Sequence, residues 1–140
     1  ESGVVAWFDW EHCGCRNPLD DVVWLLGDEY TPHWSAVEER LLERHLPAFA
    51  NGADSGASRR YLAVFGTLHM SVRLALIVSK KGAGPWWDAG QCISQDRVGV
   101  TLEMARRTCA RAGTWSLRSH LTAKLGPWFE AIARQFEAQR

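Results

Sequence analysis

Residues 58–80 read SRRYLAVFGTLHMSVRLALIVSK, and this stretch decides the fold class of the chain. Its apolar residues recur at helical spacing, and the main stripe consists of Leu62, Phe65, Leu68, Val72 and Leu76. Further apolar residues cover the other sides of the same helix. A helix that is apolar all round is typical of a helix buried in the middle of a helical domain.

The segments on either side of this stretch also have helical patterns. Asn17 and Pro18, followed by two acids, predict a helix that runs to about Leu26 and stops at Gly27, because Asn caps helix starts and Pro suits the first turn. Further helices are expected from residue 31 or 35 to about 47, over about 95–112, and from about 117 to the end, restarting at Gly126-Pro127. Residues 4–9 read as a β-strand. We therefore expect a mostly α fold, α+β overall, with one N-terminal strand or hairpin and with residues 1–140 as a single helical domain.

The expected helix over about 95–112 has two distinct faces. Its inner face consists of Val98, Leu102, Ala105, Cys109 and Ala112. Its outer face carries Arg97, Arg107 and Arg111, which we expect to be solvated. Gly113 is expected to end it.

Composition excludes several classes of protein. A chain of 140 residues that is 46% apolar fits one domain with a sizeable core. Sixteen basic and sixteen acidic residues cancel, so there is no global case for nucleic-acid or membrane binding. The apolar runs are short and are broken by His69, Ser71 and Arg73, so no membrane span is expected. Nothing resembles a signal peptide, and we expect a cytoplasmic protein with reduced cysteines.

Charge is unevenly distributed along the chain. Residues 1–70 hold eleven acidic and five basic residues, and residues 71–140 hold five and eleven. The acids crowd the start of the chain, which suits a metal or a cationic ligand, although a solvated face is the alternative. Asp9 ends the expected strand, where a carboxylate is placed to hold a hard cation such as Mg²⁺. Glu11 is close enough to add a second oxygen directly or through water.

One pattern in this region resembles a known family. Phe8-Asp9-Trp10-Glu11, then five residues, then Asn-Pro-Leu-Asp-Asp-Val-Val at 17–23 is similar to the Ile-Asp-x-Glu…Asp-Pro-x-x-Asp-Leu-Ala segment of the aminoglycoside phosphotransferase and choline kinase family, which has a protein-kinase-like fold. The resemblance implies that Asp9 binds Mg²⁺ on the ATP phosphates and that Asp21 supports the catalytic loop. It covers residues 4–23. Asn17 stands where the family has Asp, and Val22-Val23 stands where the family has Leu-Ala.

The resemblance implies an ATP- and Mg²⁺-dependent phosphotransferase that acts on a hydroxyl of a small molecule, with the helical remainder as part of the C-terminal lobe. We expect the acceptor to contact Asp28, Glu29 and Trp34. The acidic start favours a cationic acceptor such as an aminoglycoside or choline, and a sugar is equally open.

Other motifs that such kinases need are not found in the sequence. The chain has no Gly-rich loop, no strand lysine and no His-x-Asp-x-x-x-x-Asn catalytic loop. We therefore expect residues 1–140 to be the C-terminal portion of a larger protein, to need its N-terminal lobe as a partner, and to be inactive alone. The alternative is a non-catalytic helical binding module or a degenerate kinase-like scaffold. A zinc site at His12, Cys13 and Cys15 is weaker, because no second ligand pair has the required spacing.

Overall fold

The computed structural model describes residues 17–31, 35–49, 55–95 and 98–138. Within these ranges the chain forms helices and no strand, which confirms the mostly α prediction. The elements are α1 (Leu19–Gly27), α2 (Ser35–Phe49), α3 (Ser55–Lys81), α4 (Ala89–Gln95), α5 (Leu102–Ser116), the short 3₁₀ helix η2 (Ala123–Leu125) and α6 (Gly126–Glu137). The strand expected over residues 4–9 lies outside the described residues.

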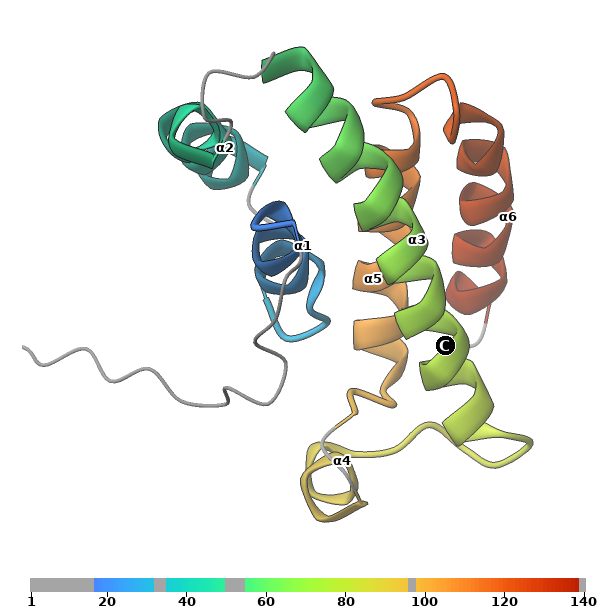
Figure 1. Ribbon diagram of the computed structural model, residues 1–140. Helices are drawn as coiled ribbons and strands as arrows, with labels where there is room; N and C mark the ends of the chain where they lie inside the picture. The colour runs from blue at the N-terminus through green and yellow to red at the C-terminus, as the bar shows by residue number, and fades with distance from the viewer. Residues whose placement is uncertain (1–16, 32–34, 50–54, 96–97, 139–140) are drawn as a thin grey trace, which may run out of the picture.

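The long helix α3 organises the arrangement of the others. It packs against α1 on one side and against α5 along much of its length, and α6 packs in turn on α5 (Figure 1). α2 lies beyond α1 and makes fewer contacts with α3. The first helix is therefore held mainly by its packing on α3.

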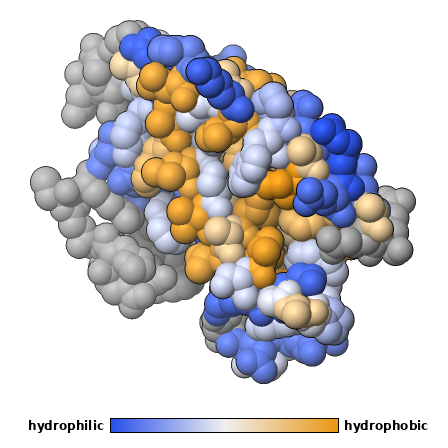
Figure 2. Space-filling model, turned by 90° about the vertical axis from the view of Figure 1, so that its right-hand side faces the viewer, coloured by the Kyte–Doolittle hydropathy of each residue, from blue (hydrophilic) through white to orange (hydrophobic). Residues whose placement is uncertain are grey.

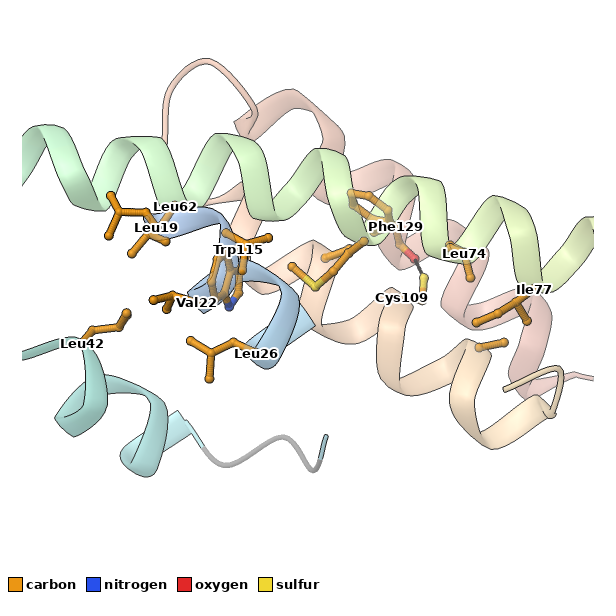
Figure 3. Close-up of a cluster of buried hydrophobic side chains, with 14 of the residues drawn as sticks. Leu19, Val22, Leu26, Leu42, Leu62, Leu74, Ile77, Cys109, Trp115 and Phe129 are labelled. Atoms are coloured by element: carbon orange, nitrogen blue, oxygen red, sulfur yellow. Dashed lines mark hydrogen bonds between the residues drawn. The ribbon is translucent and has the colours of Figure 1, made fainter. Parts of the chain in front are cut away.

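The core lies where α1, α3, α5 and α6 meet (Figure 3). Its largest fully buried side chains include Trp115 of α5, Phe129 of α6 and Met70 of α3. Gly66 of α3 lies directly against the Trp115 indole, so that a Cβ at this position would fall closer than 3.0 Å to two ring carbons. The absence of a side chain at residue 66 therefore allows α3 and α5 to approach closely.

The orientation of α3 differs from the prediction. Its buried apolar side chains include Leu62, Met70, Leu74 and Ile77, whereas Leu68, Val72 and Leu76 are exposed. The predicted main stripe was therefore wrong over most of its length, because an apolar pattern on all sides does not tell which side meets the neighbours. By length and composition alone, α3 also qualifies as a helix able to cross a membrane, a criterion that the core helix of a globular domain meets as well.

Local end signals were more reliable. Asn17 accepts a hydrogen bond from the Leu19 amide through Oδ1 at 3.0 Å, so its side chain binds the start of α1 as predicted, although α1 begins one residue later, after Pro18. α6 starts at Gly126 with Pro127 in its first turn, as predicted. Within α6, Phe129 and Phe136 are buried, whereas Trp128 is exposed.

The helix expected over about 95–112 starts later than predicted, at Leu102, and another helix, α4, precedes it. α4 ends at Gln95, residues 98–100 are not helical, and α5 begins after Thr101, whose hydroxyl accepts a hydrogen bond from the Met104 amide at 3.1 Å. The inner positions Ala105, Cys109 and Ala112 are buried as predicted. Gly113 does not end the helix, because α5 continues to Ser116.

Candidate functional site

Half of the predicted site residues fall outside the described part of the chain: Asp9, Glu11 and Trp34. The other half lie at the two ends of α1: Asp21, Asp28 and Glu29. Asp21 and Asp28 are seven residues apart along α1, so they are separated by about 10 Å along the helix axis. The structure therefore brings Asp28 and Glu29 together but places Asp21 away from them.

The start of α1 is fixed by a contact between helices. The Tyr61 hydroxyl of α3 donates a hydrogen bond to Asp20 Oδ1 at 2.5 Å. Burial, followed by this bond and the charge of Asp20, raises the pKa of Tyr61 to about 12. Successive residues on a helix point about 100° apart. Asp20 accordingly faces α3, while the side chain of Asp21 is exposed.

The turn that follows α1 is built from short polar contacts. Asp28 Oδ1 accepts a hydrogen bond from the Tyr30 amide at 2.8 Å, and the Thr31 hydroxyl donates to the Leu25 carbonyl at 2.8 Å. Such side-chain bonds to nearby backbone groups hold the chain in a defined turn. Asp28 itself is half-buried.

Glu29 points into the protein and is paired there. Its side chain is fully covered, and Arg73 of α3 binds both carboxylate oxygens, with Nε 3.0 Å from Oε2 and Nη2 on Oε1. The Gly99 amide also donates to Oε1 at 3.2 Å. Burial raises the pKa of Glu29, but the hydrogen bonds and the charge of Arg73 outweigh burial and hold the pKa below its usual value.

A second arginine holds the same turn from α5. Arg111 donates to the Asp28 carbonyl at 3.0 Å and to the Thr31 carbonyl at 2.6 Å. Its side chain is buried, so the prediction of a solvated Arg111 was wrong. The same prediction holds for Arg107, which makes a surface ion pair with Glu103 at 2.8 Å. Arg97 lies outside the described residues.

Two further titratable groups border this turn. His69 of α3 stacks at an angle on Trp24, with 4.8 Å between ring centres. Burial and then the charge of Arg73 lower the pKa of His69, against the opposing effect of Glu29. The pKa of Tyr30 is raised, mainly by burial and then by the negative charge that Cys92 would carry if ionised. We call Glu29, Tyr30, His69, Arg73 and Arg111 the Glu29 cluster.

The chemistry open to the Glu29 cluster follows from these contacts. Three N–H groups already occupy the Glu29 carboxylate, and its low pKa makes it a poor proton acceptor. Contact between Glu29 and an acceptor stays a prediction. In the described residues, no group of three His, Cys, Asp or Glu side chains is placed to hold a metal. The arrangement supports the turn, and through it the position of α1.

Arg73 and Arg111 were not singled out as site residues from the sequence. A signal for Arg73 was present, because it is a lone charge in the apolar stretch between Arg60 and Lys80, and charges at such positions are usually paired when buried. Arg111 gave no comparable signal, since its spacing matches that of the exposed Arg107.

Comparison with known proteins adds no assignment. No family model matches the chain, and neither the search of curated proteins nor that of solved structures finds a significant match.

Proposed function

We propose that residues 1–140 form the C-terminal part of an ATP- and Mg²⁺-dependent phosphotransferase that acts on a hydroxyl of a small molecule. The observation that carries this proposal is the start of α1. The helix follows Asn17-Pro18, Tyr61 binds Asp20, and Asp21 is left on the exposed side. A residue that braces a catalytic loop outside the helical domain needs such an outward position.

Each residue has a defined role in this proposal. Asp9 holds Mg²⁺ between the nucleotide phosphates with help from Glu11, and Asp21 supports the catalytic loop. The acceptor lies near Asp28 and Trp34. Glu29 keeps the turn that carries Asp28 in place through its pairing with Arg73, a role different from the acceptor contact expected from the sequence. The catalytic base and the groups that grip ATP come from residues outside 1–140.

The test uses the full product of the gene. It should transfer phosphate from Mg²⁺-ATP to at least one of an aminoglycoside, choline or a sugar. Because a metal ligand supplies several kcal/mol of charge stabilisation, Asp9→Asn should lower kcat at least about a hundredfold. Asp88→Asn is the matched control, since Asp88 is exposed and its amide replacement still accepts the Gln91 backbone hydrogen bond.

Either of two outcomes would contradict the proposal. One is turnover of Asp9→Asn equal to that of the Asp88→Asn control. The other is a full-length protein that shows no calorimetric binding of Mg²⁺-ATP. Residues 1–140 alone should show no turnover, because phosphoryl transfer depends on several positioned groups acting together.

A non-catalytic binding module is the second candidate. The observation that favours it is the exposed apolar side of α3, which includes Leu68 and Val72. A full-length protein that lacks nucleotide binding while this side engages a partner would favour it over the phosphotransferase.

A further inference from the structure

The helix α2 is joined to the domain less closely than α1, α5 or α6. Each of those three helices packs along another helix of the described chain, whereas α2 contacts mainly α3, and only sparsely. α2 lies on the opposite side of the domain from α6 (Figure 1), the side on which Figure 2 shows hydrophobic side chains gathered in a band. The buried side chains described on α2 lie four residues apart on its inner side: Glu38, Leu42 and Leu46. One of these inner positions therefore holds a carboxylate.

Two clefts lie between α2 and the rest of the domain. The larger encloses about 370 Å³ between α2 and α3, and Leu42 and Leu62 face each other across it. The smaller encloses about 150 Å³ between α2 and α1, and its lining includes Leu26 and Glu38. Well-packed protein interiors contain few voids larger than a water molecule. The contact between α2 and the domain is therefore incomplete toward both neighbouring helices.

Ion pairs supply the polar attachment of α2. Arg118, which follows α5, donates to Glu38 Oε1 at 2.5 Å, and its guanidinium lies over the Trp115 ring, 5.1 Å from the ring centre. Glu39 makes a second pair, exposed to solvent, with Arg59 of α3 at 2.7 Å. An exposed pair adds little stability, and a buried pair adds little net stability because both charges lose water. Removing one partner of a buried pair is nevertheless costly, because the other charge is left uncompensated.

We propose that α2 is a detachable helix, which leaves the domain while α1, α3, α5 and α6 stay folded, and that the Glu38–Arg118 ion pair controls its release. Segments with few buried apolar contacts open at a lower free energy than the rest of a folded domain. Two leucines attach α2, whereas the other four helices share one continuous core around Trp115. Release of α2 uncovers Leu26 of α1 and Leu62 of α3, which line the two clefts. The ion pair thus controls the exposure of an apolar surface that is buried when α2 is attached.

The experiment is amide hydrogen exchange of the 140-residue chain, followed by mass spectrometry at neutral pH without nucleotide or acceptor. A free helix of 15 residues is marginal in water, so α2 exchanges its amide hydrogens whenever it detaches. The protection factors of amides in α2 should be at least about tenfold lower than those in the buried parts of α3 and α5. Glu38→Gln should lower the protection of α2 about tenfold further, because the hydrogen bond from Arg118 loses its charge, while α3 and α5 keep theirs.

A matched control makes the same substitution on the outer side of the same helix. Glu43 is exposed on α2, so Glu43→Gln should exchange like the original chain. Equal protection of α2 and α3 in the original chain would overturn the proposal, because α2 would then open only with the whole domain. Equal protection of α2 in the two variants would do the same, as would a loss in Glu38→Gln that is as large in α3 and α5 as in α2. The assay needs no ATP, so its result is independent of the phosphotransferase proposal.

Discussion

Replacing Gly66 with alanine tests a close approach between α3 and α5. The added Cβ would lie closer than 3.0 Å to Cε3 and Cζ3 of Trp115, whereas carbon atoms in contact are normally about 3.5–4.0 Å apart. Trp115 is only 1% exposed and packs in the core with neighbours from α1, α3 and α6 (Figure 3). The indole therefore has no open space to move into, and either the ring or the helices must shift.

The expected size of the effect combines two opposing contributions. Overpacking of a core costs about 1–3 kcal/mol, and a rigid, fully buried ring favours the upper end of that range. Replacing Gly by Ala inside a helix stabilises it by about 1 kcal/mol. We therefore expect Gly66→Ala to lower the free energy of unfolding by about 2 kcal/mol. With a urea m-value of about 2 kcal/mol/M, the unfolding midpoint should fall by about 1 M.

Urea unfolding followed by circular dichroism measures this shift. Gly113→Ala is the matched control, because Gly113 is also inside a helix and its added Cβ would meet Phe129 at an ordinary 3.5 Å. That variant should be as stable as the original chain or more stable by up to about 1 kcal/mol. In a Trp115→Leu background the cost of Gly66→Ala should largely disappear. If Gly66→Ala matched Gly113→Ala in stability, the proposed packing of α3 on α5 would be refuted.

Three further predictions concern the buried polar groups. Glu29→Gln should lower the free energy of unfolding by about 1.5–3 kcal/mol at pH 7, because the bonds to Arg73 lose their charge. The folded pKa of Glu29 lies below its usual value, so its stabilising contribution is present above about pH 4.5 and is lost as the pH falls further. The urea midpoints of the original chain and of Glu29→Gln should therefore converge in acid. A difference between them that stays constant with pH would contradict this pairing. Arg111→Met should lower the free energy of unfolding by about 1.5–3 kcal/mol, and Arg107→Met should lower it by less than about 0.5 kcal/mol, because only Arg111 makes buried hydrogen bonds. Equal losses of stability would count against the buried position of Arg111. Burial raises the pKa of the Cys109 thiol to about 11. In a variant whose other cysteines are alanine, this thiol should react with a thiol reagent at neutral pH at least about a hundredfold more slowly in the folded protein than after unfolding. Similar rates in the two states would show that the thiol is accessible.

The proposals for Asp21 and for the Glu29 cluster depend on different parts of α1. The contact of Asp20 with Tyr61 sets the rotation of the first helical turn of α1. Arg73 and Arg111 hold the chain turn that follows the end of α1. Both ends of a nine-residue helix are thus tied to α3 or α5. A helix of this length is marginal by itself, so these tertiary contacts position it.

Local features of the sequence determined where several helices begin and some of the residues of α5 that face inward. Asn17 beside Pro18 and the Gly126-Pro127 pair act through backbone geometry within a few residues, so the sequence alone predicts them. The spacing of Ala105, Cys109 and Ala112 predicts their burial because polar residues occupy the opposite side of that helix. Only the tertiary structure decided which side of α3 is buried, because that helix is apolar all round and its partners choose the side. It likewise decided that Glu29 meets a residue 44 positions later and that Arg111 meets one 83 positions earlier. Such pairings depend on how distant helices pack, and local periodicity carries no information about them.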